Sequence, residues 1–459
     1  MADTPLTPST ASPATRRGLL ILVADIILFA VLLKTLPFSP QENTGLALLA
    51  FIGILWLTEA IHVTVTALLV PIMAVACGML NVDKALASFA NPTIFLFFGG
   101  FALATALHIQ KLDRLIANRL LLLAGGKMLL AALMLFGATA VLSMWISNTA
   151  TAAMMLPLAM GILSNLDRER DHNTYVFLLL GIAYSASIGG LGTMVGSPPN
   201  AIAAAQLGLD FVGWMKFGIP VMVVLMPLMV GTLYLLLRPN MKHRFDIQLE
   251  NFPWTQSRWV TLGIFLLTVF CWIFSSQLSG LLGGIKQFDT LVAVGAAVLI
   301  GISGVASWSQ IQQNTEWGVL MLFGGGLTLS VILKDSGASA VMAQGMASLF
   351  GASHWFIIIL AVATFIIFLT EFTSNTASAA LLVPVFATVA EALGMPSALL
   401  TIVIGIGASC AFMLPVATPP NAIVYGTGEI RQREMVRVGF WLNIICVLVV
   451  TLFAWFVWR

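Results

Sequence analysis

Long apolar segments follow one another through most of this 459-residue chain, and many reach the roughly 20 residues that a helix needs to cross a membrane. Only 9% of the residues are Asp, Glu, Lys or Arg, against about 25% in a soluble domain. So few charges cannot cover a water-facing surface of this size. The segments are continuous, whereas the strands of a transmembrane barrel alternate between polar and apolar residues. The sequence therefore predicts an all-α polytopic membrane protein.

The apolar segments indicate eleven transmembrane helices, which are expected at 18–37, 45–61, 63–80, 92–109, 174–206, 214–237, 258–280, 288–304, 317–334, 397–428 and 438–458. Two further apolar stretches, near 128–164 and 354–394, each contain a central Ser-Asn-Thr and are expected to be re-entrant hairpins. Residues 1–17 are polar and are expected to form a disordered tail.

The distribution of basic residues predicts how these helices are oriented. If the tail is cytoplasmic and both hairpins return to the side they entered, 15 of the 21 Lys and Arg residues lie in cytoplasmic segments. If the first hairpin crossed the membrane instead, the later basic segments would fall outside. We therefore expect the N-terminus in the cytoplasm and the C-terminus outside.

Three motifs occur twice in the same order, at offsets of 221 to 227 residues. They are SNTATAAMMLP at 147–157 and SNTASAALLVP at 374–384, GSPPNAI at 196–202 and ATPPNAI at 417–423, and Phe-Gly-Gly at 98–100 and 323–325. This order indicates two repeats, 45–237 and 258–458, joined by a cytoplasmic linker at 238–257. Each repeat holds an odd number of spans, so we expect the second to be inverted, an arrangement found in secondary transporters.

The doubled motifs also predict where binding takes place. Each Ser-Asn-Thr stands at the expected turn of a hairpin, where freed helix N-termini hold anions and freed carbonyls ligate cations. A simpler interpretation is an N-cap, since Ser before an Ala-rich helix is ordinary. Each Pro-Pro removes two N–H donors and predicts a broken helix, with a simple kink as the alternative. The Phe-Gly-Gly motifs are expected to allow close helix packing.

Charge and catalytic patterns narrow the function further. The Ser-Asn-Thr and Pro-Pro motifs contain no Lys or Arg, so a bound anion would be held by dipoles, hydroxyls, amides and co-bound cations. No phosphate-binding Gly-Lys loop and no nucleophile–base pattern is visible, so we expect a transporter rather than an enzyme. Glu59 and Glu371 lie near a span end and a motif, which leaves proton coupling open.

At these paired motifs the chain resembles the divalent anion/sodium symporter family, and in particular bacterial sodium-dependent dicarboxylate symporters. The resemblance covers essentially the whole chain after the tail. It implies a homodimer in the bacterial inner membrane, in which a transport domain moves against a scaffold domain as an elevator. It also implies symport of succinate, malate or fumarate with Na⁺. A sodium-independent dicarboxylate exchanger and a proton-coupled anion transporter of the same fold remain alternatives.

The resemblance implies site residues position by position. The dicarboxylate would contact Ser147, Asn148, Thr149, Ser197, Pro198, Ser374, Asn375, Thr376, Thr418 and Pro419. Sodium ions would lie near Ser143, Asn148 and Gly196, and near Thr370, Thr373, Asn375 and Ala417. Both hairpin motifs have Thr as their third residue, which in this family favours a dicarboxylate over citrate.

Overall fold

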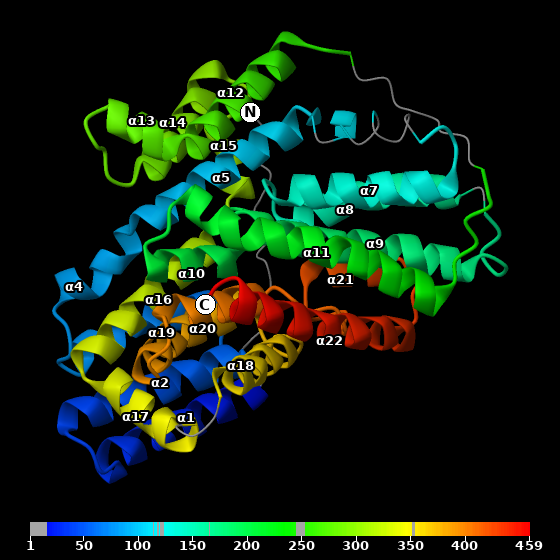
Figure 1. Ribbon diagram of the computed structural model, residues 1–459. Coiled ribbons are helices and arrows are strands. Elements are labelled where there is room, and N and C mark those ends of the chain that lie inside the picture. The colour runs from blue at the N-terminus through cyan, green and yellow to red at the C-terminus, as the bar shows by residue number, and fades with distance from the viewer. Residues whose placement is uncertain are drawn as a thin grey trace.

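The computed structural model describes residues 16–112, 114–116, 119, 124–164, 166–244, 253–350 and 354–459. Within these residues the secondary structure is helical (Figure 1), apart from one antiparallel bridge between Lys127 and Arg244. Most of the predicted tail and the middle of the predicted linker lie outside the described residues.

A peripheral helix, α1 (Arg16–Thr35), precedes the first half of the molecule, which we define as α2 to α11. The helices of this half are α2 (Pro40–Thr58), α3 (Val63–Ala76), α4 (Val82–Ala87), η1 (Ser88–Ala90), α5 (Pro92–Ile109), α7 (Met128–Ser143), α8 (Asn148–Leu163), α9 (His172–Gly189), η2 (Gly190–Gly192), α10 (Pro198–Leu207) and α11 (Phe211–Leu237).

The second half runs from α12 to α22. Its helices are α12 (Gln256–Ile273), α13 (Ser275–Leu281), α14 (Phe288–Ser303), α15 (Trp308–Asn314), α16 (Trp317–Asp335), α17 (Ala338–Phe350), α18 (Trp355–Leu369), α19 (Asn375–Ala392), α20 (Ser397–Gly407), α21 (Pro419–Tyr425) and α22 (Gln432–Phe456).

Several helices begin at caps that the sequence itself supplies. Ser39 and Glu42 form a capping box at the start of α2, where Pro40 occupies the first turn. Asn91 accepts a hydrogen bond from the backbone at the start of α5, and Asp210 does the same for α11. These caps place helix starts at the same residues in any environment, because they depend only on local chain geometry.

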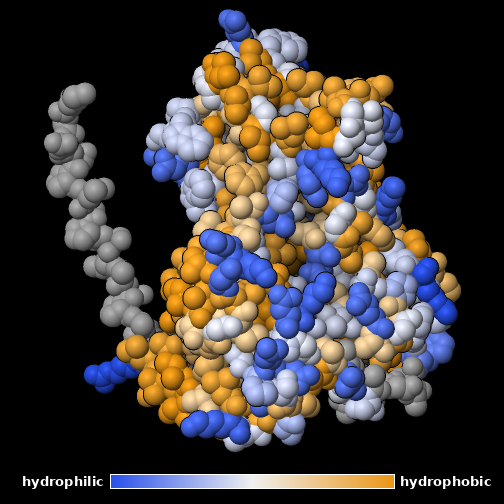
Figure 2. Space-filling model, turned by 90° about the vertical axis from the view of Figure 1, so that its left-hand side faces the viewer, coloured by the Kyte–Doolittle hydropathy of each residue, from blue (hydrophilic) through white to orange (hydrophobic). Residues whose placement is uncertain are grey.

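The apolar helices make this a multi-pass membrane protein. Eight of the described helices are long and apolar enough to cross a membrane, and six further apolar helices have 10 to 17 residues. Much of the outer surface in Figure 2 is apolar, and side chains such as Leu20, Leu235 and Ile302 are more than 70% exposed. Exposed side chains of this kind suit contact with lipid rather than with water.

Two predicted spans are interrupted in the structure. The span predicted at 174–206 is divided into α9, the short turn η2 and α10, and that predicted at 397–428 is divided by the unwound residues 408–418. The doubled prolines explain both breaks, since they remove N–H donors that a continuous helix requires. A further helix, α17, lies where none was predicted, in an Ala-rich segment of favourable helix propensity.

The two halves pack around each other in matched pairs. In the first half α7 and α8 pack on α9, and in the second α18 and α19 pack on α20. Between the halves, α5 packs on α14 while α16 packs on α3, and α10 contacts α20 while α21 contacts α9. Each inter-half contact therefore has a counterpart in which the halves exchange roles.

The Phe-Gly-Gly glycines let two of these pairs approach closely, as predicted. A Cβ atom on Gly99 of α5 would collide with the backbone carbonyl of Ala293 in α14. A Cβ atom on Gly325 of α16 would lie 2.7 Å from the carbonyl oxygen of Ala67 in α3. Small residues at such contacts are the usual means of close helix packing in membranes.

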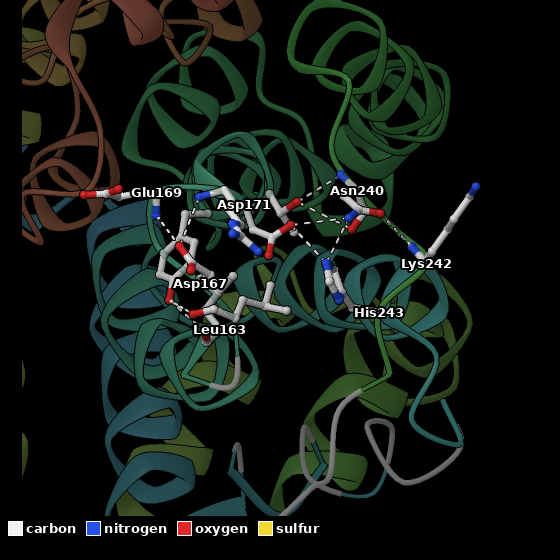
Figure 3. A network of polar contacts seen from close by, with 11 residues as sticks. Leu163, Asp167, Glu169, Asp171, Asn240, Lys242 and His243 are labelled. Carbon is white, nitrogen blue, oxygen red and sulfur yellow. Dashed lines mark hydrogen bonds and ion pairs between the residues drawn. The ribbon is translucent and has the colours of Figure 1, made fainter.

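The start of the linker is held against the first half by the polar network shown in Figure 3. His243 Nε2 lies 2.9 Å from Asp171 Oδ1, and the N–H of Asn240 donates to Thr174 Oγ1 at 3.0 Å. The N–H of Met128 donates to the His243 carbonyl at 3.4 Å. The linker therefore contacts the start of both α9 and the first hairpin.

Candidate functional site

Both Ser-Asn-Thr motifs lie at the turn of a hairpin. The chain turns at 144–147 between α7 and α8, and at 370–374 between α18 and α19. Ser147 Oγ and Ser374 Oγ each accept a hydrogen bond of 3.3 Å from the backbone N–H three residues later. The two serines are therefore N-caps, so the simpler interpretation of the motif is correct for them. The asparagines that follow are not needed for capping.

Asn148 joins the first hairpin turn to the helix break behind it. One end of its carboxamide lies 2.6 Å from Ser143 Oγ, 3.0 Å from the carbonyl oxygen of Ala186 and 3.1 Å from that of Gly196. Ser143 Oγ also donates to the Ala186 carbonyl at 2.7 Å. Three protein oxygens thus converge on one point.

Asn375 makes the corresponding contacts in the second half. Thr370 Oγ1 lies within hydrogen-bonding distance of Asn375 Oδ1 and 2.9 Å from the carbonyl oxygen of Ala408. Thr370 corresponds to Ser143 and Ala408 to Ala186, at offsets of 227 and 222 residues. The doubled sequence motifs therefore carry a doubled set of hydrogen bonds.

A second asparagine pair holds the helix breaks. Asn200 Nδ2 donates to two carbonyl oxygens in the unwound segment before it, those of Gly190 (2.8 Å) and Thr193 (2.7 Å). Asn421 Nδ2 does the same 221 residues later, at 3.2 and 3.0 Å. These bonds satisfy carbonyls that the broken helices leave without a partner, which membrane burial requires.

The two hairpin turns and the two helix breaks meet around one cavity of about 440 Å³. Its lining includes residues from all four, namely Ser147, Asn148, Thr149, Gly196, Ser197, Pro198, Pro199, Thr373, Ser374, Asn375, Thr376, Ala417, Thr418, Pro419 and Pro420. The N-terminal ends of α8, α10, α19 and α21 therefore all face this cavity. Helix N-termini carry partial positive charge and free N–H groups, both of which favour an anion.

The side chains of the cavity are neutral except for two glutamates. None of the described residues that line it is Lys or Arg, whereas Glu59 and Glu316 do line it and are exposed. An anion in the cavity would therefore be held by hydroxyls, amides and helix ends. Cations bound beside it would have to offset the negative charge that it brings.

Comparison with known proteins gives the family. The family model for the transmembrane region of sodium:sulfate symporters matches residues 14–459. The chain belongs to the divalent anion/sodium symporter family. A member of this family from Staphylococcus saprophyticus, the sodium-dependent dicarboxylate transporter SdcS, is 33% identical over 95% of this chain and 90% of its own length. An uncharacterized transporter from Haemophilus influenzae is 60% identical over 98% of this chain and 99% of its own.

A solved structure shares the fold of this symporter. The crystal structure of the YdaH transporter from Alcanivorax borkumensis matches with a TM-score of 0.56 and covers 95% of both chains. The two sequences are only 14% identical, so this likeness concerns the fold alone.

The structure of the symporter brings the predicted site residues together. All ten residues predicted to contact the dicarboxylate line the cavity. Of the residues predicted near sodium, Gly196, Thr373 and Ala417 line it together with the two hairpin asparagines, whereas Ser143 and Thr370 lie behind those asparagines with no exposed surface. What these residues bind stays a prediction.

Two serines of the cavity were missed by sequence analysis. Ser187 and Ser409 both line it, and Ser409 Oγ lies 2.9 Å from Ser197 Oγ, so that a hydroxyl of one half contacts a hydroxyl of the other. The two serines stand 222 residues apart, which the repeat could have revealed. No Pro or Asn accompanies them, however, so nothing local distinguishes them from serines that bond their own helix.

Proposed function

We propose that this symporter is a secondary active transporter that carries C4-dicarboxylates such as succinate, malate and fumarate into the cell together with Na⁺. The observation that supports it most is that one hairpin turn and one helix break from each half surround a single cavity. Broken helices that meet in this way are typical of secondary transporters. The name of the staphylococcal relative supports both the substrate class and the ion.

The dicarboxylate would lie between the two hairpin turns. In this arrangement its carboxylates accept hydrogen bonds from Asn148, Asn375 and the neighbouring Ser and Thr hydroxyls, while the helix ends supply partial positive charge. Ser197 and Thr418, each followed by Pro, close the cavity from the helix breaks. A cavity of about 440 Å³ is large enough for a small dicarboxylate with water or ions beside it.

Sodium would bind where backbone and side-chain oxygens converge behind each hairpin turn. In the first half these are the oxygens of Ser143, Ala186 and Gly196 around the Asn148 carboxamide. Carbonyl, hydroxyl and amide oxygens are the ligands that hard cations prefer. The Asn148 amide oxygen would complete this set. In the second half the equivalent set is Thr370, Asn375 and the Ala408 carbonyl, with Thr373 and Ala417 nearby.

Sodium and substrate would then be coupled through shared residues. Each hairpin asparagine belongs both to a cation set and to the lining of the substrate cavity. A bound cation orients the amide and offsets the charge of the dianion, so each ligand raises the affinity for the other. No basic side chain is needed in such a site.

Alternating access would follow from a rigid-body movement of one part of the protein against the other. We propose that the hairpins and broken helices, α7–α11 and α18–α22, form the transport domain, and that the remaining helices form the scaffold of a homodimer in the inner membrane. The two halves would be inverted repeats, with the N-terminus and the linker cytoplasmic and the C-terminus outside. Labelling a single cysteine in the linker from one side of the membrane only tests this orientation.

Uptake of radiolabelled succinate by purified protein in liposomes tests the function. We expect an inward sodium gradient to drive accumulation, whereas potassium or a pH gradient alone does not. Succinate counterflow in sodium-free liposomes would instead indicate an exchanger. Accumulation driven by a pH gradient and lost in Glu59→Gln or Glu371→Gln would indicate proton coupling.

A further inference from the structure

One carboxylate next to the cavity is fully buried and has no place in the mechanism above. Glu371 has no exposed surface and lies in the turn of the second hairpin, three residues before Ser374. Glu371 Oε1 accepts hydrogen bonds from the N–H groups of Phe412 (2.7 Å) and Met413 (2.9 Å) and from Asn443 Nδ2 (2.7 Å). Glu371 Oε2 accepts one from the N–H of Leu414 at 3.1 Å. All four partners are neutral donors.

These bonds replace the hydrogen bonds that the break in the helix removes. Residues 408–418 are unwound between α20 and α21, and the three N–H donors are consecutive in that segment. Consecutive N–H groups form a concave site that suits an anion. Without Glu371 they would be buried donors with no helical acceptor, which is costly inside a membrane protein.

The first half builds the same unit without a carboxylate. At the offsets of the two repeats, Met144 stands in the place of Glu371 and Met222 in the place of Asn443, so both members of the polar pair are replaced together. In that half the residues corresponding to 411–413 form the helical turn η2. The hydroxyl of Thr193 donates to the Met144 carbonyl, which joins turn and break in another way. The fold itself therefore does not require a carboxylate at this place.

We propose that Glu371 is a positioning residue that fixes the second hairpin turn to the unwound segment 408–418. Thr373 and Asn375 follow it on one side, and Ala417 and Thr418 end the segment on the other, so the two walls of the cavity keep the spacing that sodium and dicarboxylate need. Asn443 of α22 closes the contact from behind. This inference rests on the function proposed above and deepens it, because it makes the second sodium site depend on Glu371.

The test compares full-length wild type with Glu371→Gln in proteoliposomes. The amide preserves the volume of the side chain, but it loses the negative charge and directs an N–H₂ group toward N–H donors. We expect the sodium concentration for half-maximal uptake to rise about tenfold or more, as when a partner of a metal ligand is removed. The KM for succinate should rise with it, the rate at saturating sodium and succinate should fall less, and the pH profile should not change.

Two further variants separate positioning from general damage. Glu391→Gln makes the same chemical change at an exposed position near the end of α19 and should leave both affinities unaltered. The double variant Glu371→Gln with Asn443→Asp returns a carboxylate to the same buried contact and should restore part of the lost sodium affinity. If Glu371→Gln does not express, Asn443→Ala, which leaves the three backbone bonds in place, should give a smaller rise in the same two values.

Each outcome decides the proposal. Unchanged sodium and succinate affinities in Glu371→Gln or in its substitute Asn443→Ala would overturn it. A pH profile that flattens in Glu371→Gln while sodium affinity stays the same would identify a proton carrier instead, and would also overturn it. If the wild type takes up succinate without sodium, the proposed function fails, and the KM for succinate in these variants alone then decides the inference.

Discussion

The two halves of this symporter hold the cavity with nearly the same hydrogen bonds. In each half a hydroxyl at the end of the first hairpin helix contacts the hairpin asparagine, and a second asparagine donates to two carbonyls of the unwound segment. Ser143 and Asn200 perform these tasks in the first half, and Thr370 and Asn421 in the second. The agreement shows that the repeat preserves the contacts of a broken helix as well as its sequence.

The halves differ in how each break is anchored. In the first half the break contains the turn η2, and Trp214 Nε1 donates to the Leu191 carbonyl within that turn at 3.0 Å. In the second half no helical turn forms in the described break, and the Glu371 carboxylate accepts the N–H groups instead. A buried anion and a short helical turn are thus two solutions to the same problem of unpaired N–H groups. Only the anion joins those N–H groups directly to a hairpin side chain.

The strongest test of the symmetry replaces the two hairpin asparagines. Asn148→Ala and Asn375→Ala each remove an amide from both a cation set and the cavity lining, so we expect uptake to fall about 100-fold in both, at the upper end of losses for metal-site residues. Uptake in proteoliposomes normalised to protein content measures this. A variant that keeps more than a tenth of wild-type uptake while the other is inactive would mean that only one hairpin contacts the transported ligands.

Much of this site could be predicted because its signals are local. Two consecutive prolines break a helix wherever they stand, and a Ser before an Ala-rich segment caps it, so the breaks at 198 and 419 and the caps at 147 and 374 follow from the sequence. The repeat then indicated that the four motifs belong together.

Other features depend on the tertiary structure and were not predicted. The contact of Ser409 with Ser197 joins residues 212 positions apart, and neither serine is unusual in its own segment. The partners of Glu371 are backbone N–H groups, which leave no trace in residue types. The helix α17 was missed because its Ala-rich segment is too short and too mixed to be read as a membrane span.

The glycines that face the two breaks offer a second comparison. A Cβ atom on Gly218 of α11 would collide with the Leu191 carbonyl, and one on Gly439 of α22 would collide with the Phe412 carbonyl. We expect Gly218→Ala and Gly439→Ala each to destabilise the protein by about 3 kcal/mol, since the obstacle is backbone that cannot rotate away. Thermal unfolding of the purified variants measures this, with Gly231→Ala as a control because nothing lies near its Cβ position. Equal stability of either variant and the control would show that its break can move freely.

The asparagines that hold the breaks should separate the halves more finely. Asn200→Ala and Asn421→Ala each leave two buried carbonyls without their donor, which costs about 2 kcal/mol. The bonds of Asn421 are longer, and Glu371 holds the same segment independently, so we expect the smaller loss in the second half. Unfolding of the two single variants and of each combined with Glu371→Gln measures the difference. If Asn421→Ala is the more damaging of the two, Glu371 is not the main anchor of that break.

The smallest effect is expected at the linker, whose network involves the first half only. His243 is 37% exposed in its side chain, and the partner Asp171 keeps a second donor in Asn240 Nδ2 at 3.4 Å, so His243→Ala should cost less than about 1 kcal/mol. Asp171 immediately precedes α9, whose 18 residues place roughly 27 Å of helix between the network and the break at η2. Sodium-driven uptake should therefore equal that of the wild type. Uptake that falls as far as in Asn200→Ala would show that α9 transmits changes in the linker to the cavity, and that the first half has an anchor outside the shared framework.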